Sequence, residues 1–210
     1  MHYALYFLGF FLLCLPGAFV LQRKCRFQTL GEITDKRHLW WAWVHGLNLL
    51  DIVRAFSGVM LMQMAIGEIL PESGGMVIMA SVGLVCLIGY AMQQFFYRCD
   101  DDQMVMPVFF LAGAALAMAP IHLALMVLAM GVTTAVATRT IYCGLIASML
   151  ASGGLGMVFR ADMPAMAMLG GLCGFTLLVS LLLHRDVVLT LSTHRIYRRQ
   201  QVSDSVGALR

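Results

Sequence analysis

The stretch that decides the fold is residues 104–139, MVMPVFFLAGAALAMAPIHLALMVLAMGVTTAVATR, which has no Asp, Glu, Lys or Arg before Arg139. An apolar helix of about 20 residues crosses the hydrocarbon core of a bilayer, because each residue adds about 1.5 Å. The stretch is therefore long enough for one kinked span or for two spans that Pro120 separates, since proline ends or kinks a helix.

The composition of the whole chain supports a membrane protein. Of its 210 residues, 60% are hydrophobic and 12% are charged, against about 25% charged in an ordinary soluble domain. A soluble fold of this size leaves about 30% of the surface of its unfolded chain exposed, so it could not hide this much apolar surface. A soluble enzyme, a nucleic-acid-binding domain and a disordered regulator are thereby excluded.

The apolar runs and the cations together predict an all-α bundle of about seven transmembrane spans. The runs are 3–21, 50–70, 75–97, 104–119, 121–138, 140–159 and 164–183. With the N-terminus outside, thirteen cations fall on the inner side: Arg23, Lys24, Arg26, Lys36, Arg37, Arg54, Arg98, Arg139, Arg185, Arg195, Arg198, Arg199 and Arg210. Only Arg160 falls outside, and cations concentrate on the cytoplasmic side of membrane proteins. One long span over 104–138 would place Arg139 and the basic tail on the outer side and so remove this bias. Two spans are therefore expected there.

The expected organisation is a membrane bundle over residues 1–183, which includes a cytoplasmic loop at 22–38, followed by a basic cytoplasmic tail over 184–210. We expect a multi-pass protein of a bacterial-type inner membrane. The tail could form a short helix on anionic lipid headgroups, at about 1 kcal/mol per cation near the surface. It could equally be an ordinary topology signal.

The candidate functional residues begin the second span, where His45, Asn48, Asp51 and Arg54 recur at every third position. On a helix, residues three apart are neighbours, so Asp51 and Arg54 are close enough to pair. A lone charge in the bilayer would cost about 2.5–3.5 kcal/mol on the insertion scale, which pairing would relieve. The pattern indicates either a polar pocket near the inner leaflet, with His45 as a proton carrier, or an interfacial first turn facing headgroups.

Glu68 lies fourteen residues after Arg54 and therefore near the same face of that helix. A path from Glu68 past Gln63 to Arg54 and Asp51 is allowed by this geometry. The alternative is that Glu68 simply lies in water at the outer end of the span.

No cofactor is expected, and copper and haem are the two alternatives. Thioethers bind Cu(I), and an outer-side copper site could use Met118, His122, Met163 and Met166. Haem would need two facing histidines, for which His45 and His184 are the candidates. The Asp100–Asp102 cluster suggests Mg²⁺ and diphosphate chemistry, but the spaced pairs of aspartates seen in membrane prenyl transferases are missing, and capping of the next helix is a simpler explanation.

Small residues on the last span predict helix packing. Gly170 and Gly174 form a GxxxG pattern, which lets helices approach closely within the bundle or in a homo-oligomer.

The known seven-span families do not fit. A retinal protein needs a lysine in its last span, but the only lysines are Lys24 and Lys36. Three function classes remain. The first is a permease for a small solute or ion, the second is a non-catalytic scaffold or assembly subunit of a membrane complex, and the third is a lipid-modifying enzyme.

Overall fold

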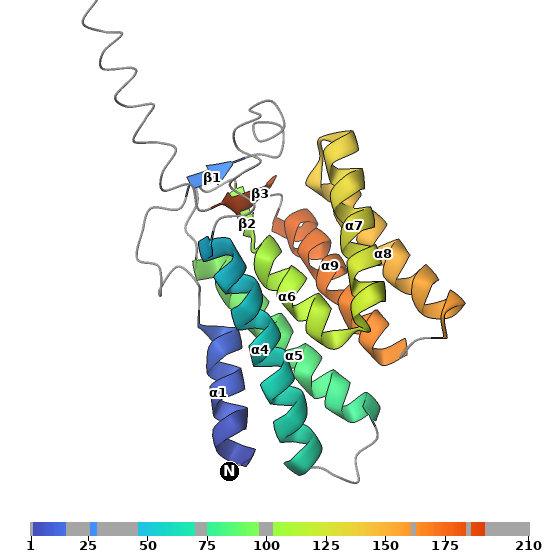
Figure 1. Cartoon of the computed structure of the whole chain (residues 1–210). Helices are drawn as coiled ribbons and strands as arrows, with labels where there is room; N and C mark the ends of the chain where they lie inside the picture. The colour runs from blue at the N-terminus through green and yellow to red at the C-terminus, as the bar shows by residue number, and fades with distance from the viewer. Residues whose placement is uncertain are drawn as a thin grey trace, which may run out of the picture.

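The fold is known from a computed structural model of the whole chain (Figure 1). It describes residues 2–15, 26–28, 46–69, 75–96, 103–160, 163–183 and 186–191.

Seven α-helices account for most of the described chain. They are α1 (His2–Cys14), α4 (Gly46–Ile69), α5 (Gly75–Phe96), α6 (Val108–Met118), α7 (Ile121–Thr138), α8 (Ile141–Val158) and α9 (Met163–Leu183). Five of them, α4, α5, α7, α8 and α9, are long and apolar enough to cross a membrane. Large apolar side chains also face outwards, among them Leu150, Leu181 and Met76, which are 65%, 73% and 72% exposed. Such a surface suits lipid rather than water, and it indicates a helical, multi-pass membrane protein.

The predicted helices agree with the observed ones where the apolar runs are long. Residues 119 and 120 are extended between α6 and α7, so the two are separate helices, as predicted. The predicted span 104–119 is wrong in its first part, because Gln103–Met106 form a strand, β2. α6 keeps only 11 residues and α1 only 13, which is about 17 and 20 Å of helix.

A small sheet closes one end of the bundle, which we call the sheet end (Figure 1). It joins β1 (Arg26–Gln28), β2 and β3 (Asp186–Leu191) in the order β1-β3-β2. β3 pairs antiparallel with β1 and parallel with β2. Residues 186–191 belong to the predicted basic tail, for which a short helix is one expectation, and the sheet instead ties them to the predicted loop 22–38.

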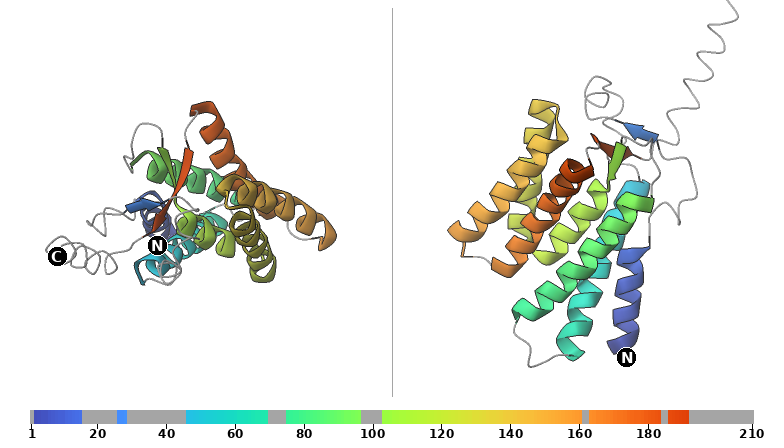
Figure 2. Two further views of the ribbon diagram at one scale, coloured as in Figure 1. Left: turned by 90° about the horizontal axis from the view of Figure 1, so that it is seen from above. Right: turned by 180° about the vertical axis from the view of Figure 1, so that it is seen from behind.

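The helices alternate in direction and form two groups (Figure 2). α1, α4, α5 and α6 pack mainly on one another, and so do α7, α8 and α9. Sparser contacts of α5 and α6 with α9, and of α6 with α7, join the groups. The first group and α9 share a hydrophobic core that includes Leu13, Met62, Tyr90, Phe110 and Leu172.

Glycines allow the closest helix contacts. A Cβ on Gly144 of α8 would lie 2.6 Å from the Cβ of Ala135 and 2.7 Å from the carbonyl oxygen of Gly131 on α7. The predicted packing residues Gly170 and Gly174 of α9 lie against Met149 of α8. Both therefore face a neighbouring helix of the same chain.

Candidate functional site

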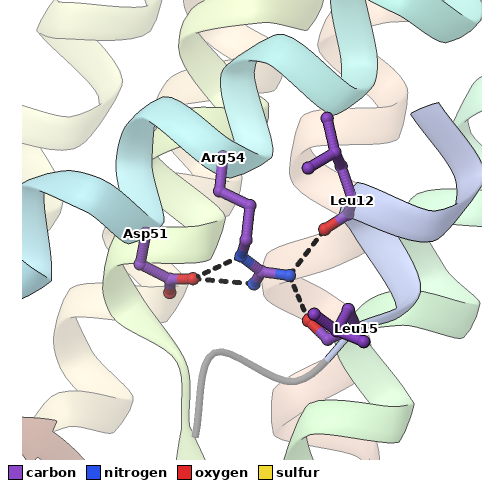
Figure 3. Close-up of polar contacts among 4 residues, drawn as sticks. All are labelled: Leu12, Leu15, Asp51 and Arg54. Atoms are coloured by element: carbon purple, nitrogen blue, oxygen red, sulfur yellow. Dashed lines mark hydrogen bonds and ion pairs between the residues drawn. The ribbon is translucent and has the colours of Figure 1, made fainter. Parts of the chain in front are cut away.

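The predicted ion pair forms in the second turn of α4 (Figure 3). Arg54 Nε donates a hydrogen bond of 2.8 Å to Asp51 Oδ1, and Nη2 lies 2.7 Å from the same oxygen. The side chains are only 8% exposed for Arg54 and 18% exposed for Asp51. Arg54 lies eight residues into the helix, or about 12 Å along its axis. The pair is therefore a largely hidden charge pair rather than a surface one.

Arg54 also binds the end of α1. Its Nη1 donates to the carbonyl oxygen of Leu12 at 2.6 Å and to that of Leu15. The last carbonyls of a helix have no partner within it and carry partial negative charge. A charged donor at this position stabilises the end of α1 by about 1.5–3 kcal/mol per hydrogen bond. Asp51 and Arg54 thus fasten α4 to α1 as well as neutralising each other.

An aromatic ring also contacts the guanidinium. The Arg54 carbon Cζ lies 5.6 Å from the ring centroid of Phe110 on α6, within the range of a cation–π contact. Phe110 is fully buried. The charge is therefore enclosed by one carboxylate, two carbonyls and a ring, and three helices supply them.

The other residues of the predicted pocket are distributed unevenly. Asn48 is buried, at 6% exposure, one turn before Asp51. His45 lies outside the described residues. Glu68 is exposed at the opposite end of α4, about 21 Å from Arg54 along the helix.

The structure does not bring Glu68 to the ion pair. The buried apolar side chains of Ala55, Val59 and Met62 lie between them on α4. Gln63, which the predicted path would pass, donates a hydrogen bond of 3.4 Å to the carbonyl oxygen of Ala117 on α6. Gln63 therefore connects two helices of the first group.

The residues of the copper alternative lie in different surroundings. Met118 and Met166 are buried in two separate hydrophobic clusters, whereas His122 and Met163 are exposed. Over the described ranges, no group of three or more His, Cys, Asp or Glu side chains is placed to hold a metal ion. The haem candidates His45 and His184 and the Asp100–Asp102 cluster lie outside those ranges.

A buried set of hydroxyl groups joins the two helix groups. The Tyr90 hydroxyl of α5 lies 2.5 Å from the Thr176 hydroxyl of α9. One turn further along α9, the Ser180 hydroxyl lies 3.0 Å from the Tyr142 hydroxyl of α8. Tyr142 also accepts a hydrogen bond of 3.2 Å from the backbone N–H of Val187 in β3. These hydroxyls connect α5, α8, α9 and the sheet.

Two glutamines at the end of α5 are buried with amide atoms that make no hydrogen bond of good geometry. Gln93 is 1% exposed and Gln94 is 3% exposed. In the described part of the chain, the Gln93 Nε2 atom and both amide atoms of Gln94 lack a partner. A buried polar group left unpaired costs about 1–3 kcal/mol, and such groups call for a bound molecule or another physical explanation. The sequence showed these residues only as the polar end of a span, and nothing in their spacing indicated burial.

An apolar cavity of about 80 Å³ lies at the sheet end between α6, α7 and α8. Leu111, Leu128, Val132 and Leu145 line it, with Ser148 as a polar group. It has no charged lining residue and is separate from the ion pair.

Comparisons of the chain with protein-family models, with curated proteins and with solved structures found no match.

Proposed function

We propose that the chain is a permease for a small solute or ion. The observation that carries this proposal is the ion pair of Asp51 and Arg54, which lies well inside an apolar helix and is almost hidden. Charged side chains within membrane spans are costly, and they commonly mark substrate or ion pathways. Asn48 and His45 would complete the polar pocket at this end of α4, and Glu68 would lie at the other end of the path.

In the proposed mechanism, a contact with the transported solute or ion temporarily replaces the contact between Asp51 and Arg54. At rest, Asp51 neutralises Arg54. During transport, a proton or cation would bind Asp51, or an anionic group would bind Arg54, and the ion pair would break. The end of α1 would then lose part of its fastening to α4, because Arg54 holds both. Solute binding would in this way be coupled to a movement between the two helices.

The proposed membrane topology has seven embedded segments, with the N-terminus outside and the sheet end in the cytoplasm of a bacterial-type inner membrane. The described cations support this orientation. Arg26 lies in β1, Arg54 in the first half of α4 and Arg139 directly after α7. These parts of the elements are at the sheet end, whereas Arg160 follows α8, which ends at the opposite end of the bundle (Figure 1), as expected when cations concentrate inside. The basic residues after β3 would then meet anionic lipid headgroups. Membrane-impermeant labels that reached both chain ends from one compartment would contradict this topology.

A pair of substitutions at Asp51 tests the permease. Asp51→Asn removes the charge but keeps an oxygen that can accept from Arg54, whereas Asp51→Glu keeps the charge. In proteoliposomes, with candidate ions and charged solutes, we expect Asp51→Asn to reduce uptake by at least about tenfold, the effect of about 1.4 kcal/mol. Asp51→Glu should retain part of the uptake, because the charge is still present. Normal uptake by well-folded Asp51→Asn would contradict the proposed mechanism.

The bonds of Arg54 to Leu12 and Leu15 favour a second candidate, a non-catalytic scaffold or assembly subunit. In a scaffold the ion pair would only fasten α4 to α1. Asp51→Asn would then leave function intact, and partner proteins would co-purify in mild detergent. Gly171 of α9 is exposed with open space around it, so Gly171→Leu probes a partner surface without disturbing the bundle. Gly170 and Gly174 are less suitable, because they face Met149 in the same chain.

A further inference from the structure

We propose that the end of α5 forms a binding site for a small uncharged solute that both donates and accepts hydrogen bonds, such as a simple amide. The site consists of Gln93, Gln94 and Tyr90. This inference rests on the proposed permease function and names the class of solute. Its evidence is independent of the ion pair.

The first evidence is unused hydrogen-bonding capacity. The Gln93 Nε2 atom and both amide atoms of Gln94 make no hydrogen bond of good geometry in the described part of the chain, and the Gln94 side chain lies close enough to the Tyr90 hydroxyl to interact with it. Both side chains are more than nine-tenths buried. Gln63 provides a contrast, because its amide is only half-buried and already bonds the carbonyl oxygen of Ala117.

The second evidence is the position of these residues. On α5, Gln93 and Gln94 follow Tyr90 by three and four residues. Residues at these spacings are neighbours on a helix, so both glutamines lie one turn beyond Tyr90 and near its face of α5. Tyr90 contacts α9 through Thr176 and contacts α6 through Phe110, with ring centroids 6.2 Å apart. Tyr90 therefore lies where the two helix groups meet, and these groups contact each other more sparsely than the helices within each group.

The surroundings determine the class of solute. The described contacts of Tyr90 are with the Thr176 hydroxyl, the Gln94 side chain and aromatic rings, all of them neutral. The described cation Arg54 contacts the same Phe110 ring as Tyr90 does, and it is already paired with Asp51. A charged solute would be left without a counter-charge in an apolar interior, which is unfavourable. A neutral amide would match a carboxamide, because each has one carbonyl oxygen and one N–H₂ group.

Stopped-flow light scattering of proteoliposomes tests the site. Urea and acetamide probe the amide class, glycerol probes other neutral solutes, and sucrose gives the water permeability alone. The variants are Gln93→Leu and Gln94→Leu, and the control is Ser81→Ala on the same helix, whose exposed hydroxyl donates to the carbonyl oxygen of Val77. We expect the native protein to raise urea permeability above that of protein-free vesicles, and Gln94→Leu to reduce this increment by about tenfold. Ser81→Ala should leave the urea permeability unchanged.

Thermal unfolding in detergent separates binding from folding. Leucine removes unpaired buried amide groups, so both leucine variants should unfold at the native temperature or above it. If they do not accumulate, Gln94→Met, which keeps the length of glutamine, replaces them. Failure of that variant to fold as well would mean that the amide is structural and would overturn the proposal.

The remaining outcomes are also decisive. Native urea, acetamide and glycerol permeabilities equal to those of empty vesicles would overturn the inference. Variants that lost only water permeability would overturn it too, because the site would then hold water. In either case, uptake of a charged solute that still depended on Asp51 would leave the permease proposal standing.

Discussion

The contact between α7 and α8 predicts that a single methyl group at Gly144 is harmful, whereas one at Gly153 in the same helix is not. The nearest atom to a Cβ on Gly144 would be the Cβ of Ala135, at 2.6 Å, followed by the carbonyl oxygen of Gly131. Carbon atoms in good contact lie about 3.5–4.0 Å apart, so the helices would have to separate by about 1 Å. A Cβ on Gly153 would meet no atom within 4 Å.

The comparison of Gly144→Ala with Gly153→Ala isolates this packing effect. Each change gains the same helix propensity, about 1 kcal/mol, so that gain cancels in the difference. Overpacking costs about 1–3 kcal/mol. At about 2–4 °C per kcal/mol for a protein of this size, Gly144→Ala should unfold about 2–12 °C below Gly153→Ala.

Thermal unfolding followed by circular dichroism in one detergent measures the difference. Adding Ala135→Gly to Gly144→Ala removes the closest contact and should recover part of the loss. Equal unfolding temperatures for Gly144→Ala and Gly153→Ala would refute the described packing of α7 on α8.

Three further predictions concern the sheet end. Asp51→Leu and Arg54→Met should each lower the free energy of unfolding by about 3–5 kcal/mol. The double variant should lose less than the sum of the two single losses, because it leaves no unpaired charge buried. Additive losses, measured by chemical unfolding, would show that the two side chains do not interact. Tyr90→Phe should cost about 1 kcal/mol, and Thr176→Val should add little to it, whereas an unchanged melting temperature would contradict the hydroxyl contact. Phe110→Ala should cost about 3–5 kcal/mol, because it leaves a cavity between Arg54 and Tyr90, and a loss below about 1 kcal/mol would contradict its described burial.

Much of the fold could be predicted from the sequence, because each long membrane helix corresponds to one continuous apolar run. The runs 75–97 and 121–138 match α5 and α7 within one residue. The prediction of a span over 104–119 is wrong in its first part, because a strand forms only where it has partner strands. Residues 103–106 pair with residues 186–189, and nothing local in either segment indicates this pairing.

The candidate site was predictable to the same degree. The pairing of Asp51 with Arg54 follows from a spacing of three residues on one helix. The bonds of Arg54 to the end of α1 depend on how two helices cross, which spacing does not specify. The burial of Gln93 and Gln94 likewise depends on the elements packed around the end of α5.

The sheet also constrains the order in which the protein can be completed. β3 is the central strand, yet it follows β1 by more than 150 residues along the chain. β1 and β2 do not pair with each other and have only β3 in common. During synthesis, the segments of β1 and β2 therefore lack their partner strand while the later helices are made. The sheet can form only after residues 186–191 have left the ribosome. A chain that stops short of this segment would leave both segments with open backbone groups at the membrane surface.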